Sequence, residues 1–82
     1  MKIRHSRHAR NNMRLYGILE EDILNVILSP DQIKTEGGKV IAIKKFADRF
    51  SGFPIKVVYI NDDENLIITA YPLKKGYGRQ RT

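Results

Sequence analysis

The pattern of apolar and polar positions divides the chain into a helical first part and an extended second part. Between residues 6 and 31 apolar side chains recur every three or four positions, as in helices that bury one face. From residue 32 onward, β-branched and aromatic residues form short runs separated by turns, as in strands. We therefore expect an α+β domain with two N-terminal helices packed on one face of a four-stranded antiparallel sheet. The expected strands are Gln32–Glu36, Lys39–Lys45, Ile55–Ile60 and Leu66–Tyr71.

Two short helices are predicted on either side of Gly17. Ser6 is a suitable N-cap for the first helix, which should run to about Tyr16. Gly17 should end that helix in the left-handed conformation that glycine adopts without strain. The second helix, Glu20 to about Leu28, begins with three acidic residues that complement its dipole, and Pro30 prevents its continuation.

The connections in the second half of the chain decide which side chains share a sheet face. Phe46–Pro54 contains three phenylalanines but is interrupted by glycine and proline, so it predicts a bent connection. If Asn61–Glu64 form a four-residue loop, Lys56 lies on the same face as Thr69 and Tyr71. A loop one residue longer or shorter moves Lys56 to the other face. Thr69 and Tyr71 stay together in either case.

Length and composition restrict the class of protein. A chain of 82 residues allows one domain, which we place at residues 1–73, with a flexible basic tail at residues 74–82. Cysteine is absent, which excludes disulfides, thiolate nucleophiles and cysteine-based metal sites. No stretch approaches the ~20 apolar residues of a membrane span. We therefore expect a cytoplasmic protein with no membrane association.

Charge is segregated along the chain. The net charge is +6, yet residues 1–19 and 72–82 contain basic residues and no acidic ones. Such segregation suggests a phosphate-binding surface and RNA as a partner, although solvated basic ends would have the same pattern. The candidate nucleic-acid contacts are Arg4, Arg7, Arg14, Lys74, Lys75, Arg79 and Arg81.

His8 is the candidate for proton transfer, because histidine ordinarily has a pKa of about 6.5. Metal-free RNA cleavage needs a base for the 2'-hydroxyl, cations for the phosphorane and an acid for the leaving 5'-oxygen. A histidine on a basic helix is more often a surface or capping residue. His5 and His8 could share a helical face as metal ligands, but no third ligand is evident, so we expect no metal and no cofactor. The candidate catalytic set is His8, Arg10, Lys56, Thr69 and Tyr71.

The same residues carry a resemblance to a family of small bacterial domains of unknown function. Its signature, S-x-H-A-x3-M-x3-G-I, is matched from Ser6 to Ile18, and its late T-A-Y strand is matched from Thr69 to Tyr71. The family is similar to the barnase, EndoU, colicin and RelE group of compact ribonuclease folds. Asn12 and Tyr16 stand where the family usually has arginine, and Arg10 and Arg14 are close enough in the sequence to substitute. The family's other matching residues are Glu21, Asp22, Ile23, Pro30, Asp31, Val57, Val58, Tyr59, Ile67 and Ile68.

This resemblance implies a reaction that the residue pattern alone does not name. It implies a RelE-like or barnase-like fold and a metal-independent endoribonuclease that leaves a 2',3'-cyclic phosphate. Many members of the wider group are toxins neutralised by an antitoxin protein, so an antitoxin is an expected partner. The alternative is a non-catalytic RNA- or protein-binding module on the same fold.

Overall fold

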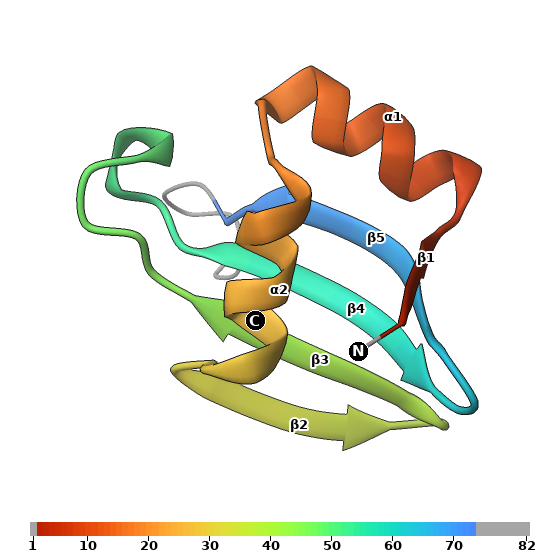
Figure 1. The fold of residues 1–82 in the computed structure, drawn as a ribbon. Helices are drawn as coiled ribbons and strands as arrows, with labels where there is room; N and C mark the ends of the chain where they lie inside the picture. Colours follow the sequence, from red (N-terminus) through yellow and green to blue (C-terminus); the bar gives the residue numbers. More distant parts are fainter. Residues whose placement is uncertain (1, 74–82) are drawn as a thin grey trace.

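The elements follow the chain in the predicted order, with one addition at the N-terminus (Figure 1). The computed structural model describes residues 2–73, so the predicted flexible tail at 74–82 lies outside the described residues. The helices are α1 (Arg7–Tyr16) and α2 (Glu20–Leu28), and a short 3-10 turn, η1, spans Phe50–Gly52. The strands are β1 (Ile3–His5), β2 (Gln32–Glu36), β3 (Lys39–Lys44), β4 (Ile55–Asn61) and β5 (Asn65–Pro72).

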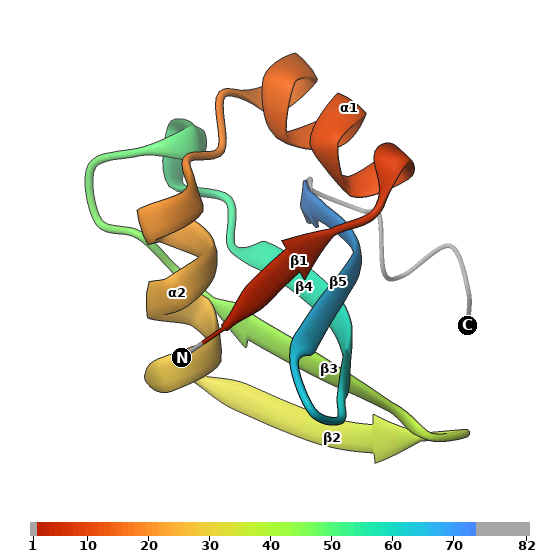
Figure 2. The same cartoon turned by 45° about the vertical axis from the view of Figure 1, so that its right-hand side comes forward.

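The sheet has five strands and is mixed, so the prediction of four antiparallel strands was wrong. Its order is β1-β5-β4-β3-β2, and β1 pairs with β5 in parallel while the other pairs are antiparallel. Figure 2 shows β1 lying beside β5. The backbone N–H of Asn65 donates to Lys2 O at 3.0 Å, and that of Ser6 donates to Ile67 O at 3.0 Å. Because β1 has three residues, it is too short for alternation to be recognised in the sequence.

The predicted caps of α1 are both present. The Ser6 hydroxyl accepts a hydrogen bond from the backbone N–H of Ala9 at 3.0 Å and donates to Ile68 O at 2.8 Å, which ties the start of α1 to β5. Gly17 has φ 69° and ψ 32°, the left-handed conformation, and its N–H donates to Met13 O. These two ends direct α1 along β5, whereas α2 lies across β3 and β4 (Figure 1).

One hydrophobic core lies between the helices and one side of the sheet. Ala9 from α1 and Ile23 and Val26 from α2 are fully buried there. Burial raises the pKa of the Tyr59 phenol above its ordinary value of 10.0, because desolvation disfavours the charged form. The other core residues are Ile18, Ala42, Ile55, Val57, Ile67 and Ala70.

No helix within residues 2–73 is long and apolar enough to span a membrane.

A β-bulge in β5 sets which side chains face away from the helices. Tyr59 pairs with Ile67, but Val58 pairs with Thr69, so Ile68 is an additional residue with no partner of its own on β4. The loop between β4 and β5 is three residues long, Asp62–Glu64. A three-residue loop without a bulge would have put Lys56 on the opposite sheet face from Thr69 and Tyr71. The extra residue Ile68 in β5 returns Lys56 to the face of Thr69 and Tyr71.

Replacing Gly17 by valine should lower the free energy of unfolding by more than about 1 kcal/mol, because a β-branched residue is strained at positive φ. A Cβ at this position would meet nothing within 4 Å, so backbone conformation and not a clash sets the cost. Thermal melting measures the loss. Gly17→Asn is the matched control, since asparagine tolerates this conformation. Equal losses for the two variants would contradict this explanation.

Candidate functional site

The sheet side that faces away from the helices, here called the open face, brings three of the candidate catalytic residues together. Lys56 pairs with Tyr71, and Thr69 precedes Tyr71 by two positions on the same strand. Residues opposite each other in an antiparallel pair point to the same side, as do residues two apart. The Lys56 ammonium nitrogen lies 5.6 Å from the centroid of the Tyr71 ring. The open face therefore holds a cation, a phenol and a hydroxyl on neighbouring positions.

Helix α1 adds a fourth polar group to this face, beside β5. The Asn12 side-chain amide donates a hydrogen bond to Thr69 Oγ1 at 3.2 Å. His8 lies one turn before Asn12, and side chains four apart in a helix share a flank. His8 is exposed. The flank of α1 that reaches Thr69 therefore also carries the imidazole.

Arg10 lies on a different flank of α1 from His8. Residues two apart in a helix do not face each other; with 3.6 residues per turn, their directions differ by about 160°. Arg10 instead continues a stripe with Arg7 and Arg14, and all three are exposed. The structure thus separates Arg10 from the other candidate catalytic residues and groups it with candidate phosphate contacts.

Of the remaining candidate nucleic-acid contacts, the part of the chain that the structure describes contains Arg4. Arg4 is exposed on β1, where its Nε lies 3.8 Å from Glu64 Oε1. At this exposure the ion pair contributes little to stability. The other four candidates, Lys74, Lys75, Arg79 and Arg81, lie outside the described residues.

His5 does not share a helical face with His8, because it belongs to β1. Its side chain is 12% exposed, and its Nε2 lies 3.5 Å from Glu20 Oε1. Neither ring nitrogen has a hydrogen-bond partner among residues 2–73. Within residues 2–73, no three histidine, cysteine, aspartate or glutamate side chains are grouped so that they could hold a metal ion.

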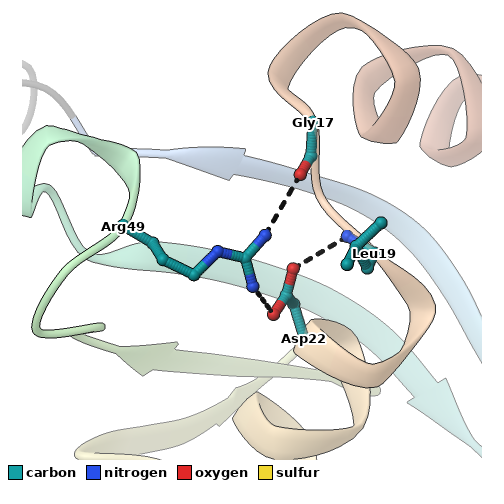
Figure 3. Close-up of polar contacts among 4 residues, drawn as sticks. All are labelled: Gly17, Leu19, Asp22 and Arg49. Carbon is teal, nitrogen blue, oxygen red and sulfur yellow. Dashed lines mark hydrogen bonds and ion pairs between the residues drawn. The ribbon is translucent and has the colours of Figure 1, made fainter.

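An ion pair between the buried Asp22 carboxylate and the partly exposed Arg49 connects the start of α2 to the bent segment before β4 (Figure 3). Asp22 is 1% exposed, and its carboxylate accepts hydrogen bonds from the Arg49 guanidinium and, at 2.8 Å, from the Leu19 backbone N–H. Arg49 also donates to Gly17 O at 3.5 Å, and its guanidinium lies 4.6 Å from the Phe50 ring centroid. The pair therefore fixes the junction between the helices, and with it the direction of α1.

The sequence reasoning missed three of these residues. It treated Asn12 only as the absence of an arginine, although the amide contacts the candidate site directly. It assigned the acidic start of α2 to the helix dipole and gave Arg49 no role. An available signal was the spacing Leu19-x-x-Asp22, in which an aspartate at the third helical position can accept from the N-cap N–H.

The open face also exposes apolar surface beyond the polar cluster. Ile41 pairs with Val58, and Ile60 pairs with Leu66, so all four side chains point to this side. Each is only half-buried. A partly exposed row of this kind next to a cation and an aromatic ring can contact a base, a sugar or an apolar side chain.

The fold and the site define an α+β domain with helices on one sheet face and a polar cluster on the other. The chain belongs to the family described as Domain of unknown function (DUF4258), whose model matches residues 5–72. A search of curated proteins found no match, and neither did a search of solved structures.

Proposed function

We propose that this protein is a metal-independent endoribonuclease. The observation that carries the proposal is the bulge at Ile68, which restores Lys56 to the side of Thr69 and Tyr71 where Asn12 and its flank of α1 approach. Together with His8 on that flank, they supply the chemical groups that RNA cleavage without a metal requires: a base, a cation and hydroxyl donors. The resemblance of the Ser6–Ile18 and Thr69–Tyr71 motifs to ribonuclease folds of the RelE and barnase kind supports the same reaction.

In the proposed reaction His8 acts as the general base. The imidazole takes the proton of the 2'-hydroxyl, and the 2'-oxygen then bonds to the adjacent phosphorus. The Lys56 ammonium and the Thr69 hydroxyl stabilise the negative charge on the phosphorane oxygens. The phosphorus–5'-oxygen bond breaks, and the Tyr71 phenol beside Lys56 protonates the leaving oxygen. The products are a 2',3'-cyclic phosphate and a free 5'-hydroxyl.

The proposal also includes residues that bind the RNA beside the cleaved bond and a protein partner. Arg7, Arg10 and Arg14 form one exposed stripe on α1 and would bind RNA phosphates flanking the cleaved bond. Many members of the ribonuclease group that the motifs resemble are toxins neutralised by a partner, so we include an antitoxin protein as a partner. An adjacent reading frame for a small acidic or DNA-binding protein would support that part.

A binding module without catalysis is the second candidate, and the half-buried apolar residues of the open face favour it. Ile41, Val58 and Leu66 resemble a contact surface more than a reaction site. Asn12 and Tyr16 in place of arginine also remove two charges that would grip a phosphate. Incubation with RNA, followed by analysis of the fragment ends, separates the candidates, because a binding module leaves the RNA intact.

The salt dependence of RNA affinity tests the proposed phosphate contacts, whether the protein is a ribonuclease or an RNA-binding module. On single-stranded RNA, log affinity should fall against log salt with a slope of about −0.7 for each phosphate neutralised. Replacing Arg7, Arg10 and Arg14 together by glutamine should make that slope shallower by about 2. The matched control replaces the exposed Lys34, Lys39 and Lys45, which removes the same charge near β2 and β3. Equal changes in the two triple variants would show that net charge and not the α1 stripe determines binding.

A further inference from the structure

Asn12 connects α1 to the open face through a single hydrogen bond with a definite direction. Its amide nitrogen donates to Thr69 Oγ1 at 3.2 Å across 57 positions of sequence. Both side chains are half-buried, so the bond is partly shielded from water. A hydroxyl has one hydrogen to donate and can accept at its lone pairs. When Thr69 accepts from Asn12, its own hydrogen stays available to another acceptor.

The position of that hydrogen suits an anion held by Lys56. Thr69 is the diagonal neighbour of Lys56, which pairs with Tyr71, and diagonal neighbours in an antiparallel pair lie about 7–8 Å apart. A phosphate group between them can accept from the Thr69 hydroxyl and from the Lys56 ammonium at once. Hydrogen bonds to a charged acceptor are roughly twice as strong as those between neutral groups.

We propose that Asn12 is a positioning residue that makes the Thr69 hydroxyl a hydrogen-bond donor to an RNA phosphodiester on the open face. The inference rests on the proposed RNA function and deepens it, since it assigns the phosphate position to Thr69 and Lys56. Asn12 acts through Thr69 and does not itself touch the phosphate. The amide thus has a role different from that of an arginine, which would bind the phosphate directly.

Replacing Asn12 by aspartate tests this direction, because a carboxylate only accepts. The Thr69 hydrogen must then turn toward Asp at position 12 and away from the phosphate. We expect Asn12→Asp to weaken single-stranded RNA binding at least about 10-fold. Asn11→Asp is the matched control, since Asn11 is exposed and adjacent on the same helix. It adds the same charge without a contact to Thr69 and should weaken binding less than about 3-fold.

A variant of Thr69 separates positioning from a purely structural effect. Thr69→Val removes the hydroxyl, so in that background Asn12→Asp should cost no more affinity than Asn11→Asp does. Thr69→Ser keeps the hydroxyl and should bind RNA like the wild type. A merely structural role for Asn12 would instead lower the melting temperature of Asn12→Asp in parallel with the loss of RNA affinity.

The outcomes distinguish this inference from the proposed function. Equal effects of Asn12→Asp and Asn11→Asp, or an undiminished effect of Asn12→Asp in the Thr69→Val protein, would overturn the positioning role while wild-type RNA binding stands. Wild-type protein that does not bind RNA at low salt would overturn the proposed function, and the positioning role with it. A 10-fold loss that disappears with Thr69→Val supports the role.

Discussion

Replacing His8 by alanine should lower RNA cleavage about 100-fold or more, which is the usual contribution of a general acid or base. His8 is exposed, so the melting temperature should change little. RNA affinity should also stay nearly constant, because the phosphate contacts in the proposed reaction come from other residues. The measurement is the single-turnover rate of fragment formation with saturating protein, which removes binding from the comparison.

The control for His8 is another exposed residue of α1. Asn11→Ala changes the same helix surface without touching the candidate site and should cleave at the wild-type rate. Equal rates for His8→Ala and the wild type would remove His8 from the mechanism. RNA that stays intact with the wild type as well would favour the binding module over the ribonuclease.

Replacing Arg49 by methionine should reduce the free energy of unfolding by about 3 kcal/mol, because it leaves the Asp22 carboxylate buried without its cation. Asp22 is 1% exposed, and it retains its hydrogen bond from the Leu19 N–H but has no compensating charge. Methionine keeps most of the apolar length of arginine. Urea denaturation measures the loss through the midpoint and slope.

Two comparisons show whether the buried charge is responsible. Arg10→Met removes an exposed arginine from α1 and should change stability by no more than about 0.5 kcal/mol. Asp22→Asn combined with Arg49→Met should recover part of the loss, since a neutral amide can still accept from Leu19. Equal losses for Arg10→Met and Arg49→Met, or no recovery in the double variant, would contradict the explanation.

Replacing Arg49 by methionine should also change the geometry of the candidate site. The Arg49 guanidinium donates to Gly17 O as well as to Asp22, and Gly17 directs the exit from α1. A loosened junction should therefore displace Asn12 and His8 relative to β5. We therefore expect the geometry of the candidate site to depend on this ion pair, although neither partner belongs to the open face.

The helix ends and the turn between β2 and β3 were predictable from the sequence. Ser6, Gly17 and Pro30 act on the backbone within a few residues, so their effects do not require knowledge of distant contacts. Gly37 and Gly38 both have positive φ, and Glu36 pairs with Lys39, as a two-residue turn between the expected strands Gln32–Glu36 and Lys39–Lys45 requires. The structure confirmed these elements.

For the candidate site, the sequence alone could predict only which side chains share a strand face or a helix flank through local periodicity. Thr69 and Tyr71 share a face because strand side chains alternate. His8 and Arg10 cannot face each other because they are two apart in a helix; the predicted catalytic set overlooked this. The presence of Lys56 beside Tyr71 depended on a register that could not be derived from loop length alone.

Tertiary structure decided the features that join distant segments. β1 forms because the edge of β5 offers it unpaired backbone groups, and the bulge at Ile68 sets the register against β4. Asp22 and Arg49 meet across 27 positions, and Asn12 and Thr69 across 57. Local propensity, capping and alternation determined the helices, the antiparallel strands and their turns, since each acts over a few residues. The fifth strand, the face of Lys56 and the Asn12–Thr69 contact depended on which surfaces pack together, which no local pattern encodes.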